Sequence, residues 1–227
     1  MDAPSPASTV VPLFPLPHGA LLPGELLPLH VFEPRYRVML EAVRKGDRLL
    51  AVATLLPGWE ADYHGTPAVA EVVGLGRIVK DRLNPDGTSD IVLHGLLRGE
   101  LVEELPGKPF RRARLVLRGD GHRHPAEVYR LRRGLLTGIA ERLRNRQLSF
   151  DLTAGFDVGA LVDRIASALD LSAEQRVEML QALDLERRVE LLLELLRDKA
   201  HRQQLLEIVP SLHAFSLALG SPLGPVT

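Results

Sequence analysis

The sequence predicts an α+β fold, in which a small β-barrel is followed by a bundle of α-helices. Short apolar runs separated by Pro, Gly and Asn extend to residue 118, and long helical periods follow a glycine-bracketed turn signal at residues 119–121. Many short strands at such spacing are typical of a barrel. We expect a barrel lobe over residues 9–118, a helical lobe over residues 119–209, and flexible tails at residues 1–8 and 211–227.

The runs in the first lobe have the length and composition of β-strands. They cover residues 10–14, 26–31, 48–53, 68–73, 76–79, 90–95 and 112–117. Residues 84–87, Asn-Pro-Asp-Gly, predict the turn of a hairpin from Ile78 to Leu93, because Pro presets φ and Asp-Gly tolerates positive φ. Residues 74–76, Gly-Leu-Gly, lack the third glycine of a dinucleotide fingerprint and lead into a strand, so they predict a β-bulge instead.

One helix is expected among these strands, from Pro34 to Lys45, with Gly46 as its stop. Its apolar face consists of Tyr36, Met39, Leu40 and Val43.

The second lobe is expected to hold four amphipathic helices. Apolar stripes run over residues 128–143 and 158–169. Ser172 and Gln175 form a capping-box pattern at the start of a third helix, and Asp184 can cap a fourth that continues until shortly before Pro210.

Composition limits the function classes. The chain is 45% hydrophobic and 25% charged with a net charge of −1, so no overall field attracts nucleic acid or an anionic membrane. Cysteine is absent, which excludes disulfides, thiolate nucleophiles and Cys-ligated zinc. No secretory signal pattern opens the chain and no apolar run reaches the ~20 residues of a membrane span, so we expect a soluble, cytoplasmic protein.

Catalytic motifs are missing from the sequence. The nearest fragment to a Walker A motif, Gly107-Lys108-Pro109, has proline where a magnesium-binding hydroxyl is needed. Neither G-x-S-x-G nor H-E-x-x-H occurs. His122 and His124 could hold a metal, but no third ligand stands at useful spacing. We therefore expect no enzyme activity, no cofactor and no metal.

Arginine is concentrated between residues 111 and 146, where eleven arginines stand against three acidic residues. One interpretation is that this excess follows a phosphate backbone. The other is that these arginines are solvated or pair with acidic residues such as Glu186, Glu190 and Glu194. Only one aromatic residue, Tyr129, interrupts the run, so the stacking surface typical of single-strand recognition is missing. The second interpretation is favoured, and nucleic-acid binding is kept as the alternative.

Two segments supply candidate peptide-binding residues. Trp59 and Tyr63 belong to a loop-type segment, where an aromatic residue can anchor a partner or simply cover a barrel end. Leu21 and Leu22 lie in a proline-rich connection, as exposed contacts or as a plug in the barrel, of which the plug is favoured.

Several strings resemble the Lon-protease N-terminal domain family. The opening signature is spread over residues 11–17, 22–24 and 27–37, and further matches follow at residues 69–72, 86–87, 91–98, 110–113, 163–167 and 183–188. The basic stretch at residues 77–82 departs from the family pattern. The 227 residues hold neither an ATPase module nor a Ser-Lys protease domain, so we expect the resemblance to be to free-standing members of the family.

The resemblance implies a PUA-like β-barrel followed by a helical bundle. It also suggests a structural role for residues 32–37, in which Phe32 and Tyr36 face the core, while Glu33 and Arg35 fix the corner between strand and helix. The implied function is non-catalytic binding of unfolded or apolar polypeptide segments, as an accessory to a protease or chaperone. RNA binding is the alternative, because PUA-like barrels in other families hold RNA.

Overall fold

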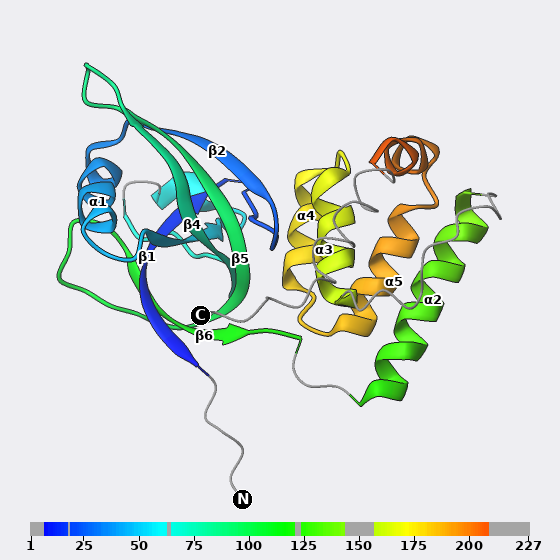
Figure 1. The fold of residues 1–227 in the computed structure, drawn as a ribbon. Helices are drawn as coiled ribbons and strands as arrows, with labels where there is room; N and C mark the ends of the chain where they lie inside the picture. The colour runs from blue at the N-terminus through cyan, green and yellow to red at the C-terminus, as the bar shows by residue number, and fades with distance from the viewer. Residues whose placement is uncertain (1–6, 18, 63–64, 121–123, 144–156, 209–227) are drawn as a thin grey trace, which may run out of the picture. The chain divides into compact units, whose positions relative to one another are not determined.

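A computed structural model describes residues 7–17, 19–62, 65–120, 124–143 and 157–208, and it confirms the α+β fold (Figure 1). The first part of the chain holds six strands, helix α1 (Pro34–Arg44) and the 3₁₀ helix η1 (Trp59–Asp62). The strands are β1 (Ser8–Leu16), β2 (Leu26–Val31), β3 (Leu49–Thr54), β4 (Val72–Leu83), β5 (Ser89–Glu104) and β6 (Arg112–Arg118). Helices follow from Pro125 onward.

The six strands form one sheet that closes on itself. Their order is β2-β5-β4-β3-β1-β6, and a further pairing of β5 with β6 closes the ring. Strand β5 belongs to both ends of this order because it is 16 residues long: residues 89–94 pair with β2 and residues 98–104 pair with β6. Strand β2 therefore lies outside the closed ring, and within the described residues it pairs with β5 alone.

The predicted hairpin and bulge are both confirmed. Strands β4 and β5 pair in register with Ile78 opposite Leu93, and the register shifts between Leu75 and Gly76. The hairpin extends away from the rest of the sheet (Figure 1). The strand expected at residues 68–73 was wrong for its first part, since Val69 makes only an isolated bridge to Leu55 and β4 begins at Val72.

Alternate residues of the same strands enter two hydrophobic clusters. Leu13 and Ala51 belong to one cluster with Val73, Leu75 and Leu115. Their neighbours Phe14 and Val52 belong to the other, which also contains the apolar face of α1. That face consists of the four residues predicted for it, Tyr36, Met39, Leu40 and Val43. This period-2 alternation is what a strand buried on both faces requires.

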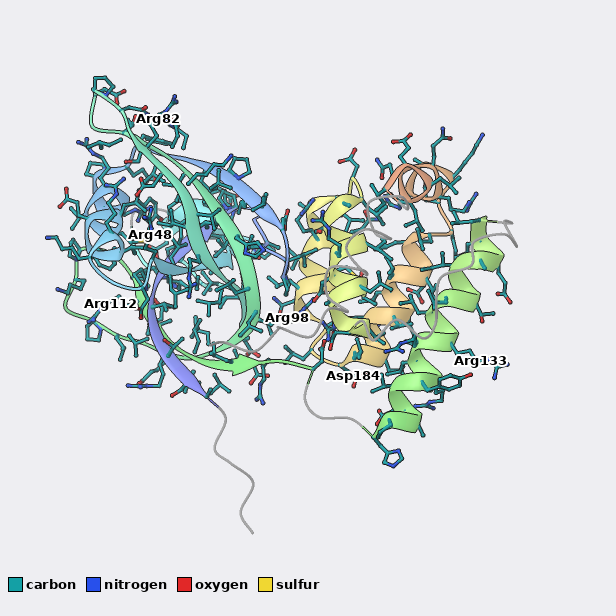
Figure 2. The ribbon with its side chains drawn as sticks, viewed as in Figure 1. Arg48, Arg82, Arg98, Arg112, Arg133 and Asp184 are labelled. Carbon is teal, nitrogen blue, oxygen red and sulfur yellow. The ribbon has the colours of Figure 1, made fainter. Side chains whose placement is uncertain are left out.

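Contacts divide the chain into two compact units. One consists of Met1–Gly119 with Leu171–Leu183, and the other of Asp120–Asp170 with Asp184–Thr227. The structure differs from the predicted division at α4 (Ala173–Gln181), which groups with the sheet. Buried Arg98 on β5 donates to the carbonyl oxygens of Leu180 and Met179 at 3.1 and 3.0 Å (Figure 2). A helical period cannot show which core a helix joins, so this assignment needed tertiary structure.

The predicted helix caps are confirmed. Ser172 and Gln175 form a complete capping box at the start of α4. Asp184 accepts a hydrogen bond from the backbone N–H of Arg187 and caps α5 (Leu185–Leu195). In both cases a side-chain oxygen satisfies a donor that the first helical turn leaves free.

The second unit is helical in its described residues. It contains α2 (Pro125–Leu143), α3 (Val158–Ala168), α5 and a further helix over residues 199–208. The prediction of one continuous helix to Pro210 was wrong. The chain leaves α5 after Leu195, and Asp198 accepts a hydrogen bond from the N–H of Ala200 at the start of the next helix. An aspartate at this position competes for the backbone and favours a new cap over a helix interior.

A buried ion cluster holds this unit together. Arg188 of α5 is buried and contacts Asp163 of α3 at 3.1 Å, and its guanidinium also contacts Asp120. Removing one partner from such a cluster leaves an uncompensated buried charge, which costs about 3–5 kcal/mol. None of the described helices is long and apolar enough to span a bilayer.

Candidate functional site

The most distinctive surface of the first unit lies on the strand that is outside the ring. We call β2 together with residues 78–83 of β4 and 89–94 of β5 the arm. One face of the arm packs against α1, because Val31, Ile78, Ile91 and Leu93 share a cluster with the helix. We call this the packed face and the opposite side the exposed face.

A column of apolar and aromatic side chains follows β2 along the exposed face. Leu26 is 60% exposed and Phe32, just past the strand, is 61% exposed. Pro28 and His30 lie between them at alternate positions and are also exposed. The rings of His30 and Phe32 stack with centroids 6.1 Å apart. We call these four residues the β2 column.

Charged side chains lie beside the column on the neighbouring strands. A cavity of about 470 Å³ is bordered by Pro28 and His30 of β2, by Asp90 and Val92 of β5, and by residues 80–82 of β4. Asp90 accepts hydrogen bonds from Arg82 at 2.5 Å and Asn84 at 3.1 Å, and lies 2.7 Å from His30 Nδ1. Arg82 stands near the hairpin tip (Figure 2).

The pKa of Asp90 is held far below its usual range by these partners. His30 is the first cause, followed by Arg82 and Asn84. Each of them stabilises the carboxylate form by a hydrogen bond. Asp90 is therefore an anion at neutral pH, and it is already paired within the protein.

On the packed face, an ion-pair cluster fastens the arm to α1. Arg44 donates to both carboxylate oxygens of Asp81 at 2.9 and 2.7 Å, and to the hydroxyl of Ser89 at 2.9 Å. Arg48 adds a contact of 3.2 Å to Asp81 (Figure 2). The hydrogen bond from Arg44 is the main cause that lowers the pKa of Asp81, and the same bond raises the pKa of Arg44. The arm is thus held on one side and open on the other.

Comparisons with known proteins identify the family to which this architecture belongs. The model of the "ATP-dependent protease La (LON) substrate-binding domain" family matches residues 10–198. The chain belongs to the Lon substrate-binding domain family. In the solved N-terminal domain of a Mycobacterium avium complex Lon protease, 84% of this chain and all of that one superpose with a TM-score of 0.62 at 17% identity, which shows the fold alone. The Lon N-terminal domain protein from Xanthomonas campestris gives a TM-score of 0.57 at 27% identity over 82% of this chain and 98% of that one.

Curated relatives are whole Lon proteases. Lon protease 2 of Herpetosiphon aurantiacus is 27% identical over 83% of this chain, and the Lon protease of Salinispora arenicola is 29% identical over 87%. The chain spans 24% and 25% of their lengths. It therefore corresponds to about a quarter of each of these proteins.

In this Lon substrate-binding domain, two of the four candidate binding residues are inaccessible. Leu21 and Leu22 are completely buried. Three glycines make room for them: a Cβ added at Gly74 or Gly95 would lie 2.1 or 2.0 Å from the carbonyl oxygen of Leu21 or Leu22, and one at Gly76 would lie 2.6 Å from the Leu21 side chain. The two leucines plug the sheet, which was the favoured interpretation, and offer no surface to a partner.

The other two candidates lie in the connection between β3 and β4. Trp59 opens η1 and is half-buried. Tyr63 lies outside the described residues. Of the three candidates that the structure describes, none belongs to the β2 column or borders the cavity beside it.

The corner after β2 was only partly predicted. Arg35 contacts Glu33 at 3.0 Å and lies over the ring of Tyr36, whose centroid is 4.7 Å away. Tyr36 is buried in an edge-on contact with Phe14, as expected. The expectation that Phe32 faces the core was wrong: Val31 takes the inward position, and strand alternation turns Phe32 outward.

Arginines of the basic run have local partners in the described residues of β6 and its flanks. Arg111, Arg114 and Arg118 contact Glu104, Glu103 and Glu100 of β5 at 2.5 to 2.7 Å. In the helical unit, Arg130 lies 3.6 Å from Glu186, one of the acidic partners predicted for the run. The interpretation of paired surface charges is supported here. His122 lies outside the described residues, within which no group of three potential ligands could hold a metal.

Two other hollows lie on the described surface. One of about 400 Å³ is lined by Tyr36, Phe110 and two arginines, and both guanidinium groups are already paired, Arg111 with Glu104 and Arg35 with Glu33. The other, about 570 Å³, follows α2 past Gly134 and Gly138 and is bordered by Arg133 (Figure 2). Neither combines exposed apolar side chains with an open strand edge.

Sequence reasoning missed the β2 column because leucines occupy both faces of β2. One signal could have found it. Proline cannot donate to a ladder, so Pro28 favours an edge position for residues 26–31, although β1, which pairs with both β3 and β6, also contains Pro12 and Pro15.

Proposed function

We propose that this Lon substrate-binding domain binds unfolded, apolar polypeptide segments on the exposed face of the arm, without catalysis of its own, and presents them to a protease or chaperone. The single observation that carries the proposal is the β2 column, where Leu26 on the strand and Phe32 just past it are about 60% exposed, while the other face of the strand packs against the core. Exposed apolar groups gathered beside a cavity are typical of a binding surface.

Family membership supports the same function, since the matching model describes a substrate-binding domain. RNA binding has less support, because Arg111, Arg114 and Arg118 are paired with glutamates of β5 and are not free to track phosphates. The affinity for clients should be modest, because an unfolded segment loses conformational entropy when it docks.

The test measures binding of a fluorescent unfolded casein by anisotropy, at low and high salt, with a structured RNA as competitor. We expect binding that tolerates salt and that RNA does not displace. The double variant Leu26→Ser with Phe32→Ser should weaken it about tenfold or more, because two apolar contacts of roughly 1 kcal/mol each are lost.

Val102→Ser is the matched control, because Val102 is 57% exposed on the part of β5 beyond the arm. It should bind casein like the unaltered protein. Equal weakening by both changes would argue against the exposed face as the binding surface. Salt-sensitive RNA binding with no casein binding would replace this function with nucleic-acid recognition.

A further inference from the structure

We infer that clients are held by strand addition: an extended polypeptide segment pairs antiparallel with the free edge of β2, with its alternate apolar side chains on the β2 column. The inference rests on the proposed function and deepens it. It names the conformation of the client, the backbone groups that hold it and the spacing of its apolar residues.

The free edge offers backbone hydrogen-bonding groups. In an antiparallel pair, alternate residues direct N–H and C=O toward one neighbour and the intervening residues direct theirs to the other side. Pro28 lies opposite Val92 and has no N–H to give to β5. The ladder to β5 therefore uses Leu27, Leu29 and Val31, while the N–H groups of Leu26 and His30 and the carbonyls of residues 26, 28 and 30 point outward.

Backbone and side chains at this edge select the same client residues. In an antiparallel pair, a client residue that hydrogen-bonds to His30 lies directly opposite it and shares its face of the sheet. Because the side chains of residues 26, 28 and 30 lie on the exposed face, so do those of the client residues that bond to the edge. The client thus needs apolar residues at every second position, each donating its own N–H to β2.

A second copy of β2 fits this edge less well than a foreign segment does. Two copies of β2 can pair antiparallel through the outward N–H and C=O groups of residues 26, 28 and 30. The register that uses most of these groups places Pro28 opposite Pro28, and that central pair then lacks both of its N–H···O bonds. A client without proline at that position loses only one. Proline at the centre of an edge is a known means of opposing self-association.

Charge on the exposed face acts against basic clients. Arg77, Lys80 and Arg82 of β4 lie on this face opposite His94, Val92 and Asp90 of β5. Asp90 is the acid among these six residues, and it is already paired with Arg82. The exposed face therefore carries an excess of positive charge. At a Debye length of about 8 Å, salt only partly screens this charge from a strand bound at the edge. A segment with acidic or neutral residues between its apolar ones is therefore favoured.

The probe is a capped, fluorescent peptide of alternating valine and glutamate, with a lysine version for comparison. N-methylation of the valines removes the N–H groups that face β2, while N-methylation of the glutamates removes those that face away. We expect the first modification to abolish binding and the second to preserve it. Lysine in place of glutamate should weaken binding a fewfold.

On the protein, His30→Pro removes one outward N–H and His30→Ala is its matched control. Both variants lose the imidazole and its contact with Asp90, but only proline removes the donor. We expect His30→Pro to bind the valine–glutamate peptide about three- to tenfold more weakly than His30→Ala, the effect of one net hydrogen bond. Thermal unfolding checks that both variants fold, and Leu26→Pro compared with Leu26→Ala replaces the pair if they do not.

Equal binding by His30→Pro and His30→Ala, or equal loss from the two N-methylation patterns, would overturn strand addition while casein binding still upholds the proposed function. If the unaltered protein does not bind casein, the proposed function itself is refuted. A dimer in sedimentation that His30→Pro converts to monomer would assign the edge to self-pairing and also overturn the inference.

Discussion

Residues 20–22 and strand β2 are separated by only three residues and both contain leucine, yet the first leucines of the two segments differ completely in solvent exposure. Leu21 and Leu22 are fully buried, whereas Leu26 is one of the most exposed apolar residues of the first unit. The first segment crosses strands that carry glycine where a Cβ would collide with it, and the second is an edge strand with packing on one side only. Leucine identity alone therefore says nothing about exposure; the neighbouring surfaces decide it.

The largest expected effect comes from Leu21→Ala, which removes a completely buried side chain from the larger hydrophobic cluster. The free energy of unfolding should fall by about 2–5 kcal/mol, because transfer and cavity terms add. Leu26→Ala should change it by less than about 0.5 kcal/mol, as an exposed side chain. Urea unfolding measures both, and similar losses at the two positions would break the comparison.

A smaller effect is expected from Gly95→Ala. The new Cβ would lie 2.0 Å from the carbonyl oxygen of Leu22, which is backbone and cannot rotate away. We expect a loss of about 1–3 kcal/mol from overpacking. Gly134→Ala in α2 is the control, since its Cβ meets nothing within 4 Å, and it should gain up to about 1 kcal/mol from helix propensity. Neutral behaviour of Gly95→Ala would mean that the plug is not tightly held.

The smallest effect concerns the ion-pair cluster that fastens the arm to α1. Arg44 lowers the pKa of Asp81, so this carboxylate stabilises the fold above its unfolded pKa of about 4 and loses that contribution as the pH falls through its lower folded value. Asp81→Asn should cost about 1 kcal/mol at pH 7. The difference from the unaltered protein should shrink on acidification, as measured by urea unfolding across pH. A difference that stays constant with pH would show that the charge of Asp81 is not what anchors the arm.

More of the secondary-structure elements than of the candidate site could be predicted from the sequence. Local chemistry predicted the Asn-Pro-Asp-Gly hairpin, the bulge at residues 74–76, the apolar face of α1 and the caps at Ser172 and Asp184, because each depends on residues that are close in sequence. The break at Asp198 and the inward position of Val31 in place of Phe32 were missed, since a leucine-rich helix and a leucine-rich strand each allow more than one register.

The sequence by itself determined the α+β class, the family, and the positions of most strands, turns and caps, because periodicity and backbone preference are local properties. Only the tertiary structure decided that α4 joins the sheet through Arg98, that Leu21 and Leu22 fill the space above three glycines, and that β2 pairs on one side only among the described strands. The physical reason is that burial and strand pairing depend on neighbours distant in the chain. The candidate site consists of what those neighbours leave uncovered.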